Sequence, residues 1–500
     1  MRIQRALVCS ATAMVIAAAQ PATAVSEPAD PVAVYLTTTD LRTTLQRQPD
    51  LEFTTGSIPN GERVVVNPAM TGQVLTAGFG VAMTESSAYL LSDHLPKAQR
   101  EDVIRKLFSP TEGIGLSFLR LPIGASDYVV GELGTPDDQP PGGADPSLRD
   151  FSIDRDMKYV IPAARAAVEA NPNMTVMANP WTPPAWMKTD DTLVTTTGPL
   201  GHLKPEYYPA FAQYLVKFVQ AYRDQGIPID YLGVQNEPMT PLAMVVGIPE
   251  SYLDPVQQGI LIRDHIAPAL AQAGLSIGVM AYDDGFQRSE VYIPGVMSQA
   301  RDQVAGFAYH CYLTDPSSID IQSRAYPEKA QLVTECSSKL SNVDPQQMMI
   351  RSLRAGAQGI QLWNAVLDQN GGPKMGNGCR GLVGPSAGQD CIAPVTVNTD
   401  HNDYSFTSDY WALAHFSKFI QLGAKRVDTT TPSACPTTPV SGWQCGLEGV
   451  TFDNPDGSRV LVVTANDGTD HTFTLSDSGR KTTYTLPAGA TATLVWKPVA

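Results

Sequence analysis

Residues 229–238 read IDYLGVQNEP, an apolar run that closes on Asn236, Glu237 and Pro238. A second run, QLVTEC at residues 331–336, closes on Glu335. Apolar runs of this length are typical of strands that are buried on both faces in a parallel sheet. A carboxylate at the tip of such a strand is costly to bury unless it is used. The alternative reading is that each glutamate is a salt-bridged strand end.

Strand-like runs alternate with helical patterns between about residues 75 and 420. Apolar residues three and four apart predict helices at 205–224, 254–273 and 345–357. The alternation predicts a parallel sheet, and eight repeats predict closure into a (β/α)₈ TIM barrel, whose catalytic residues lie at the strand tips. An open doubly wound sheet is the alternative, although no GxGxxG motif follows the first strand. The predicted strands are 74–82, 115–122, 174–179, 231–237, 276–282, 304–310, 331–335 and 359–364.

The C-terminal residues 426–500 follow a different pattern. Short Thr- and Val-rich runs are separated by turn residues, which predicts antiparallel strands. Strand-like pieces also occur in residues 25–74. We therefore expect an α/β chain with a catalytic barrel at 75–425 and an antiparallel β-sandwich side domain built from both termini. The C-terminal strands are predicted at 460–465, 471–476, 481–486 and 490–496.

The first 24 residues have the pattern of an export signal. Arg2 and Arg5 precede an apolar stretch, and Ala22, Thr23 and Ala24 form a small-residue cleavage site. The apolar stretch is shorter than the roughly 20 residues that a membrane helix needs. We expect cleavage near Ala24, a secreted protein and no integral membrane segment.

The chain is acidic, with a formal net charge of −15. This charge disfavours nucleic acid and anionic membranes as partners, because both require clustered basic residues. The sequence gives no sign of an obligate protein partner. It also contains no CxxC pair and no HExxH motif, so we expect no metal site and no cofactor.

Six of the seven cysteines lie beyond the export signal. Local spacing in Gly- and Pro-rich loops favours two disulfides, Cys379–Cys391 and Cys435–Cys445, as in other exported proteins. Cys311 and Cys336 stand at two predicted strand ends, and we expect them to pack as small buried thiols.

Two carboxylates that face one cleft are the minimum equipment for breaking a glycosidic bond. Glu237 would serve as the acid/base and Glu335 as the nucleophile of a double displacement that retains configuration. The carboxyl groups should then be about 5–5.5 Å apart. The amide of Asn236 could donate to the sugar hydroxyl next to the reacting carbon.

Several motifs stand along most of the chain: GFGVAMT at 78–84, LRLPIGASD at 119–127, NPWTPPAWMK at 179–188, QNEP at 235–238, HCY at 310–312, TEC at 334–336 and HFSKF at 415–419. In type and order they resemble those of glycoside hydrolase family 30, the family of glucosylceramidases and microbial β-1,6-glucanases. The resemblance implies a barrel with a two-termini β side domain, an acid/base in the NEP motif and a nucleophile on the seventh strand.

The resemblance also implies substrate-binding residues after the second and third strands. Asp127 matches a position that binds sugar hydroxyls, with a loop cap as the alternative. Trp181 matches an aromatic residue that lines the glucose pocket. Arg120 would hold the carboxylates in position, which is compatible with an ordinary buried ion pair.

Four further residues complete the expected pocket. His310 and Tyr312 lie at the tip of the sixth strand, where a buried core histidine is the alternative. Trp363 would form the pocket floor at the eighth strand, with a plain core aromatic as the alternative. Asn377, in the glycine-rich loop before Cys379, is the fourth candidate.

The motifs look closer to the β-1,6-glucanase branch of the family. Glucosylceramidases carry a tryptophan after the sixth-strand histidine, where this chain has Cys311. We therefore expect a secreted retaining hydrolase of β-D-glucosidic bonds, acting on β-1,6-glucan in endo or exo fashion. A glucosylceramidase or general β-glucosidase is one alternative, and an inactive carbohydrate-binding protein is another.

Overall fold

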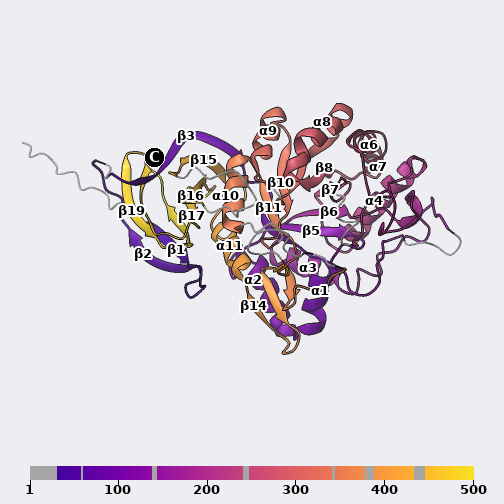
Figure 1. Cartoon of the computed structure of the whole chain (residues 1–500), viewed down its shortest axis with the longest axis horizontal. Helices are drawn as coiled ribbons and strands as arrows, with labels where there is room; N and C mark the ends of the chain where they lie inside the picture. The colour runs from indigo at the N-terminus through magenta and orange to yellow at the C-terminus, as the bar shows by residue number, and fades with distance from the viewer. Residues whose placement is uncertain are drawn as a thin grey trace, which may run out of the picture.

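A computed structural model describes residues 31–57, 60–137, 143–239, 247–312, 314–339, 344–376, 379, 388–432 and 445–499. Within these ranges the chain forms a closed barrel of eight parallel strands beside a nine-stranded sheet (Figure 1). No helix in the described ranges is both long enough and apolar enough to traverse a bilayer.

The eight barrel strands fall within or overlap the eight predicted runs, and their closure into a barrel excludes the open-sheet alternative. Each strand pairs in parallel with the next, and the last strand closes on the first. The approach of the first two strands is so close that a Cβ on Gly80 would lie 1.5 Å from the Phe118 carbonyl oxygen. The strands are β4 (Gly78–Ala82), β5 (Phe118–Ile123), β6 (Thr175–Pro180), β7 (Tyr231–Gly233), β8 (Gly278–Gly285), β9 (Val304–His310), β10 (Ala330–Glu335) and β11 (Gly359–Leu362).

Helices connect the barrel strands and surround them (Figure 1). Asp254 and Asp344 cap two of these helices by accepting hydrogen bonds from backbone N–H groups of the first turn. The α-helices are α1 (Glu85–Tyr89), α2 (Lys97–Phe108), α3 (Val160–Ala170), α4 (Tyr208–Asp224), α6 (Pro255–Leu261), α7 (Ala267–Gln272), α8 (Ser289–Ala300), α9 (Ser317–Ala325), α10 (Pro345–Ala355) and α11 (Ser408–Ser417). Short π and 3₁₀ turns are η1 (Leu90–His94), η2 (Ala185–Met187), η3 (Pro205–Tyr207), η4 (Ile262–Ile266) and η5 (Phe286–Arg288).

A small three-stranded sheet follows the last barrel strand. Its strands are β12 (Val366–Asp368), β13 (Val395–Asn398) and β14 (Asp403–Phe406). Leu367 of this insertion packs with Trp181, Trp363 and the cysteines Cys379 and Cys391 in one buried cluster. The insertion therefore contacts the aromatic residues expected in the pocket.

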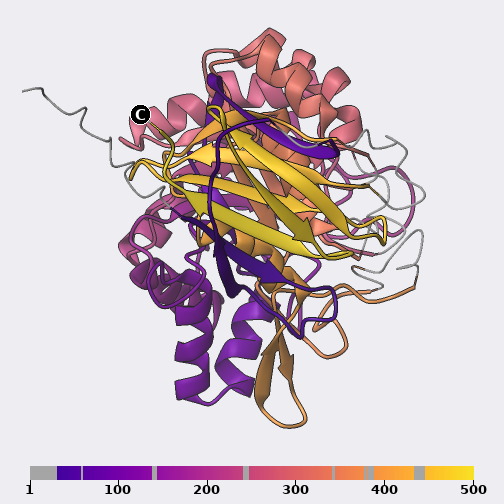
Figure 2. The ribbon, with the colours of Figure 1, turned by 90° about the vertical axis from the view of Figure 1, so that its left-hand side faces the viewer.

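The side sheet combines strands from both ends of the described chain, as expected. In Figure 2 yellow strands from the C-terminal part and indigo strands from the N-terminal part lie in the same sheet. The sheet runs in the order β19-β18-β3-β15-β16-β17-β20-β1-β2. Its strands are β1 (Val32–Thr37), β2 (Gln46–Leu51), β3 (Glu62–Val74), β15 (Lys425–Thr430), β16 (Glu448–Asp453), β17 (Arg459–Thr464), β18 (His471–Asp477), β19 (Arg480–Leu486) and β20 (Thr491–Trp496).

The predicted side domain built from both termini is confirmed, and its sheet is mixed because one pairing is parallel. β3 runs parallel to β18, with Phe473 opposite Glu62 and Leu475 opposite Val64. Short turns between neighbouring strands enforce antiparallel pairing. β3 reaches β18 from a distant part of the chain, so no hairpin fixes its direction.

Candidate active site

Glu237 and Glu335 meet at the carboxyl ends of the barrel strands. Glu335 is the last residue of β10. Glu237 lies beyond β7, which ends at Gly233 rather than at the predicted position 237. The backbone of Glu237 has a left-handed φ of 42° and donates to the carbonyl of Asp283 at 2.9 Å. A non-glycine residue in that region is strained, and such strain concentrates at functional sites.

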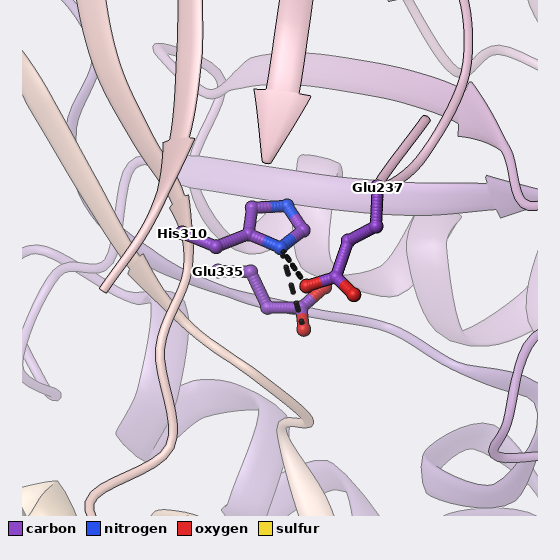
Figure 3. A group of neighbouring side chains, drawn as sticks. All are labelled: Glu237, His310 and Glu335. Carbon is purple, nitrogen blue, oxygen red and sulfur yellow. Dashed lines mark hydrogen bonds and ion pairs between the residues drawn. The ribbon is translucent and has the colours of Figure 1, made fainter. Parts of the chain in front are cut away.

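The two carboxylates are close enough to act on the same atom. One oxygen of Glu237, one oxygen of Glu335 and a ring nitrogen of His310 all lie within 4.8 Å of one another (Figure 3). An inverting pair needs a separation of about 6.5–9.5 Å to admit a water, whereas a retaining pair is about 5–5.5 Å apart. The spacing therefore suits direct attack by one carboxylate.

His310 is a buried cation between acidic groups. Its Nδ1 lies 2.8 Å from Glu237 Oε1 and 3.8 Å from Glu335 Oε1, and its Nε2 lies 3.3 Å from Asp283 Oδ1. Burial lowers the pKa of His310, but the charge of Glu335 and the hydrogen bonds to Asp283 and Glu237 outweigh burial and raise it to about 10. The three groups in Figure 3 are spaced to hold a cation, but an imidazolium has no lone pair for a metal.

Arg120 and Tyr312 hold the two oxygens of Glu335. The Arg120 guanidinium, fully buried on β5, donates from Nη1 to Oε2 at 2.6 Å, and the Tyr312 hydroxyl donates to Oε1 at 3.0 Å. Arg120 Nη2 also donates to the side-chain oxygen of Asn236 at 2.7 Å. That bond fixes the amide of Asn236 so that its NH₂ group is left to donate elsewhere.

Trp181 and Trp363 stack on each other, with ring centroids 4.9 Å apart and planes inclined by 23°. The Arg120 guanidinium lies 4.9 Å from the first ring and 5.4 Å from the second. Arg120 thus contacts the aromatic pair on one side and Glu335 on the other. Both rings are buried. Trp363 is therefore a core aromatic residue, as the alternative held, and it also lies beside the site.

Asp127 is buried beside the same aromatic pair. Burial raises the pKa of Asp127 well above its ordinary value, and the charges of Glu335 and Glu237 raise it further against a hydrogen bond from Trp363. Its Oδ1 has no hydrogen-bond partner within the part of the chain that the structure describes. Buried polar atoms are normally hydrogen-bonded, and a sugar hydroxyl could bond to this oxygen. Asn377, the remaining candidate, lies outside the described residues.

The expectation that Cys311 and Cys336 are thiols was wrong. They form a disulfide that joins the residue after His310 to the residue after Glu335. Parallel neighbouring strands bring the two tips together, and this proximity is not visible from a separation of 25 positions. Cys379 and Cys391 form the other described disulfide, as their spacing suggested. Cys445 is disulfide-bonded, and Cys435 lies outside the described residues.

Comparison with known families assigns both parts of the chain. The model of the glycosyl hydrolase family 30 TIM-barrel domain matches residues 76–420, and the model of the family's β-sandwich domain matches residues 423–494. The chain belongs to glycosyl hydrolase family 30. Its members are retaining O-glycosyl hydrolases.

Relatives within family 30 carry two kinds of name. An endo-1,6-β-D-glucanase of Neurospora crassa is 32% identical over 77% of this chain and 78% of its own length. The lysosomal acid glucosylceramidase of Mus musculus is 27% identical over 80% of this chain and 76% of its own. A solved endo-β1,6-glucanase structure superposes with a TM-score of 0.77 at 27% identity, covering 93% of this chain and 99% of that one.

The site of this family 30 chain contains a residue that the sequence analysis missed. Asp283, on β8, contacts Arg120 and His310 from a fully buried position. The fifth strand was predicted to end at Tyr282, three residues before the observed end of β8 at Gly285 and one residue short of Asp283. The rule that selected Glu237 and Glu335, an acid at a strand tip, would have selected Asp283 had the strand been drawn to its full length.

Proposed function

We propose that this protein is a retaining β-1,6-glucanase in which Glu237 is the acid/base and Glu335 the nucleophile. The observation that carries the proposal is the close approach of the two carboxylates around His310. Hydrogen bonds from Tyr312 and Arg120 orient the Glu335 carboxylate. The side chain of Glu237 is 21% exposed to solvent, against 8% for that of Glu335. An acid/base must admit water in the second step, so the greater exposure suits Glu237.

The proposed reaction has two steps. Glu335 attacks the anomeric carbon while Glu237 gives its proton to the departing glycosidic oxygen, which leaves a covalent glycosyl-enzyme. Glu237 then removes a proton from water, and the resulting attack releases the sugar and restores Glu335. Two inversions give net retention. Asn236 would donate to the 2-hydroxyl, and Asp127 with Trp181 would bind the rest of the ring.

Two features favour β-1,6-glucan over a glucosylceramide as substrate. Three relatives named endo-1,6-β-D-glucanase are 30–32% identical to this chain, whereas relatives named glucosylceramidase are 26–28% identical. Cys311 stands where glucosylceramidases carry a tryptophan, and it is committed to a disulfide. A glucosylceramidase or general β-glucosidase stays the second candidate because relatives of that name also match most of the chain.

Product analysis tests the substrate. The purified protein is incubated separately with pustulan, laminarin, xylan and glucosylceramide. Release of gluco-oligosaccharides from pustulan alone is the expected result, and the size distribution over time separates endo from exo action. Release of glucose from glucosylceramide with no action on pustulan would overturn the β-1,6-glucan assignment.

The Glu335→Gln variant tests the chemistry against the alternative of an inactive binding protein. Loss of the nucleophile should lower turnover of an aryl β-glucoside by roughly 10³-fold or more while the affinity for oligosaccharide is kept. An unmodified protein that binds glucan but releases no sugar would establish the binding protein instead.

We also propose that the protein is exported. Two disulfides lie within the described ranges, Cys311–Cys336 and Cys379–Cys391, and disulfides persist in oxidising compartments. They support the expectation drawn from residues 1–24. Fractionation of cells that express the full chain would locate the protein and show whether it starts near Val25, and retention of the uncleaved chain in the cytoplasm would contradict export.

A further inference from the structure

The backbone of β8 departs from regular pairing where it reaches the site. Its register with β9 shifts between Tyr282 and Asp284. Tyr282 and Asp283 both adopt left-handed φ angles, 78° and 64°. Two consecutive non-glycine residues in that region are rare and strained. The irregularity puts the Asp283 carboxylate into the space between strands β5, β9 and β10.

Four side chains converge on the Asp283 carboxylate. Oδ2 accepts from Arg120 at 2.8 Å and from Asn179 at 2.7 Å. Oδ1 accepts from Thr334 at 2.6 Å and lies 3.3 Å from His310 Nε2. The side chain is 1% exposed. The four side chains come from four different barrel strands, so both oxygens of the carboxylate are fixed in position by the barrel.

Two of these four partners also touch the catalytic glutamates. Arg120 uses Nη1 to donate to Glu335, while Nη2 is held by Asp283. His310 presents Nδ1 to Glu237, while Nε2 faces Asp283. A third link is the backbone, because the carbonyl of Asp283 accepts from the N–H of Glu237.

We propose that Asp283 is the positioning residue of the catalytic pair, since one carboxylate fixes Arg120 against Glu335 and His310 against Glu237. The inference rests on the roles proposed above for the two glutamates. Asp283 does not touch substrate in this arrangement. It acts through the two cations and sets the distance at which the acid/base and the nucleophile face the sugar.

The charges of the cluster suit this role. Burial raises the pKa of Asp283, but Arg120 and His310 outweigh burial and hold it well below its ordinary value, so the carboxylate is ionised. Three carboxylates, Asp283, Glu237 and Glu335, then face two cations, and a single proton neutralises the set. A retaining mechanism starts with one protonated and one ionised glutamate, which requires the same single proton.

The Asp283→Asn variant tests the proposal, because it keeps the shape and removes the charge. We expect kcat to fall about 100-fold with KM changed by less than about 3-fold, since geometry in the transition state is lost rather than binding. The basic limb of the kcat profile should move to lower pH by roughly one unit, because His310 loses an anion that holds its proton. The other titratable groups beside the cluster, Asp127, Asp284 and Tyr312, are unchanged in the variant and have raised pKa values.

Asp477→Asn is the matched control. Asp477 is also fully buried and accepts from Arg459 at 2.7 Å and from the Trp496 indole at 2.8 Å, but it lies in the side sheet. Both variants should lower the melting temperature, and only Asp283→Asn should lower kcat and shift the pH profile. The proposal would be overturned if Asp283→Asn had the kcat and pH profile of the wild type and only a lowered melting temperature, as in the control. Asp283 would then serve the fold as a structural ion pair.

Thr334 provides a second route if Asp283→Asn does not fold. Thr334→Val removes one donor to Asp283 without removing its charge, and Thr334→Ser restores the hydroxyl. We expect kcat to fall about 5- to 10-fold in the valine variant and to recover in the serine variant. Equal kcat in all three proteins would overturn the proposal. Failure of the proposed function looks different, because the unmodified protein would then release no sugar, or Glu335→Gln would stay active, whatever Asp283→Asn does.

Discussion

At the scale of single residues, the site is a set of charges whose protonation is settled by burial and by neighbours. His310 is held as a cation, and Asp283 is held as an anion. Asp127 is pushed the opposite way, since burial and two nearby carboxylates favour its neutral form. A neutral carboxyl offers a sugar both a donor and an acceptor.

Substitution of Asp127 distinguishes a neutral carboxyl from a carboxylate. Asp127→Asn keeps a neutral donor and acceptor, so kcat/KM should fall by about 10-fold or less. Asp127→Ala leaves the sugar hydroxyls unpaired in a buried site and should cost about 100-fold or more. Steady-state kinetics on an aryl β-glucoside measures both. An asparagine variant as inactive as the alanine variant would show that the charge is needed.

Residues that end buried strands can be predicted from the sequence. Residues in irregular backbone cannot, because no apolar run marks them. Glu237 and Glu335 are recognisable because each closes an apolar run. Asp283 is hidden because β8 continues to Gly285 through the left-handed residues Tyr282 and Asp283, past the apolar run that the sequence shows. Thr334 and Asn179 lie within the quoted family motifs, but their role as donors to Asp283 depends on where the barrel places Asp283.

At the scale of secondary-structure elements, a covalent bond ties the tips of β9 and β10. Cys311 N–H donates to the carbonyl of Glu335 at 3.0 Å, and the carbonyl of Cys336 accepts from Trp363 N–H at 2.7 Å. The disulfide and these backbone bonds connect the tips that carry His310, Glu335 and Trp363.

Removal of this disulfide should affect both stability and turnover. The Cys311→Ala, Cys336→Ala double variant lacks the disulfide that joins two residues 25 positions apart. Loss of this constraint on the unfolded chain should lower the free energy of unfolding by about 3 kcal/mol. We expect kcat to fall roughly 10-fold because the catalytic tips lose their tether. Denaturant unfolding and kinetics well below the melting temperature measure the two effects. Unchanged kcat in a destabilised variant would show that the bond serves the fold alone.

The barrel strands were predictable because each is a continuous apolar run between turn residues. The direction of β3 was not, because its partner β18 lies some 400 residues further along the chain and no connecting turn constrains the pair. The pairing of Cys311 with Cys336 depends in the same way on strand neighbours that only the closed barrel defines.

At the scale of the whole molecule, the side sheet packs on the barrel helices through a shared core. Val450, Phe452, Val460 and Val462 of the sheet belong to the same buried cluster as the barrel helices. His415 of α11 extends this contact with two hydrogen bonds of 2.8 Å, from Nδ1 to Thr493 and between Nε2 and Thr37. The Thr493 hydroxyl donates to the carbonyl of His415, so its oxygen accepts from Nδ1–H. Burial keeps the ring neutral.

This contact should make the protein sensitive to acid. Burial lowers the pKa of His415 to about 3, whereas an unfolded histidine has a pKa near 6.5. Between these values only the unfolded chain binds the proton, so stability is complete above about pH 6.5 and is lost as the pH falls. The slope contributed by this group approaches 1.4 kcal/mol per pH unit. His415→Gln should flatten the fall in unfolding free energy between pH 6.5 and 4, and an unaltered slope would contradict the assignment.

The proposed function depends on direct attack by Glu335 on a sugar that lies between Glu335 and Glu237. The most direct measurement is covalent trapping with an activated 2-deoxy-2-fluoro-β-glucoside, followed by mass spectrometry of the digested protein. We expect one sugar per chain, attached to Glu335. A sugar attached to any other residue, or turnover of the reagent with no adduct at any time, would contradict it.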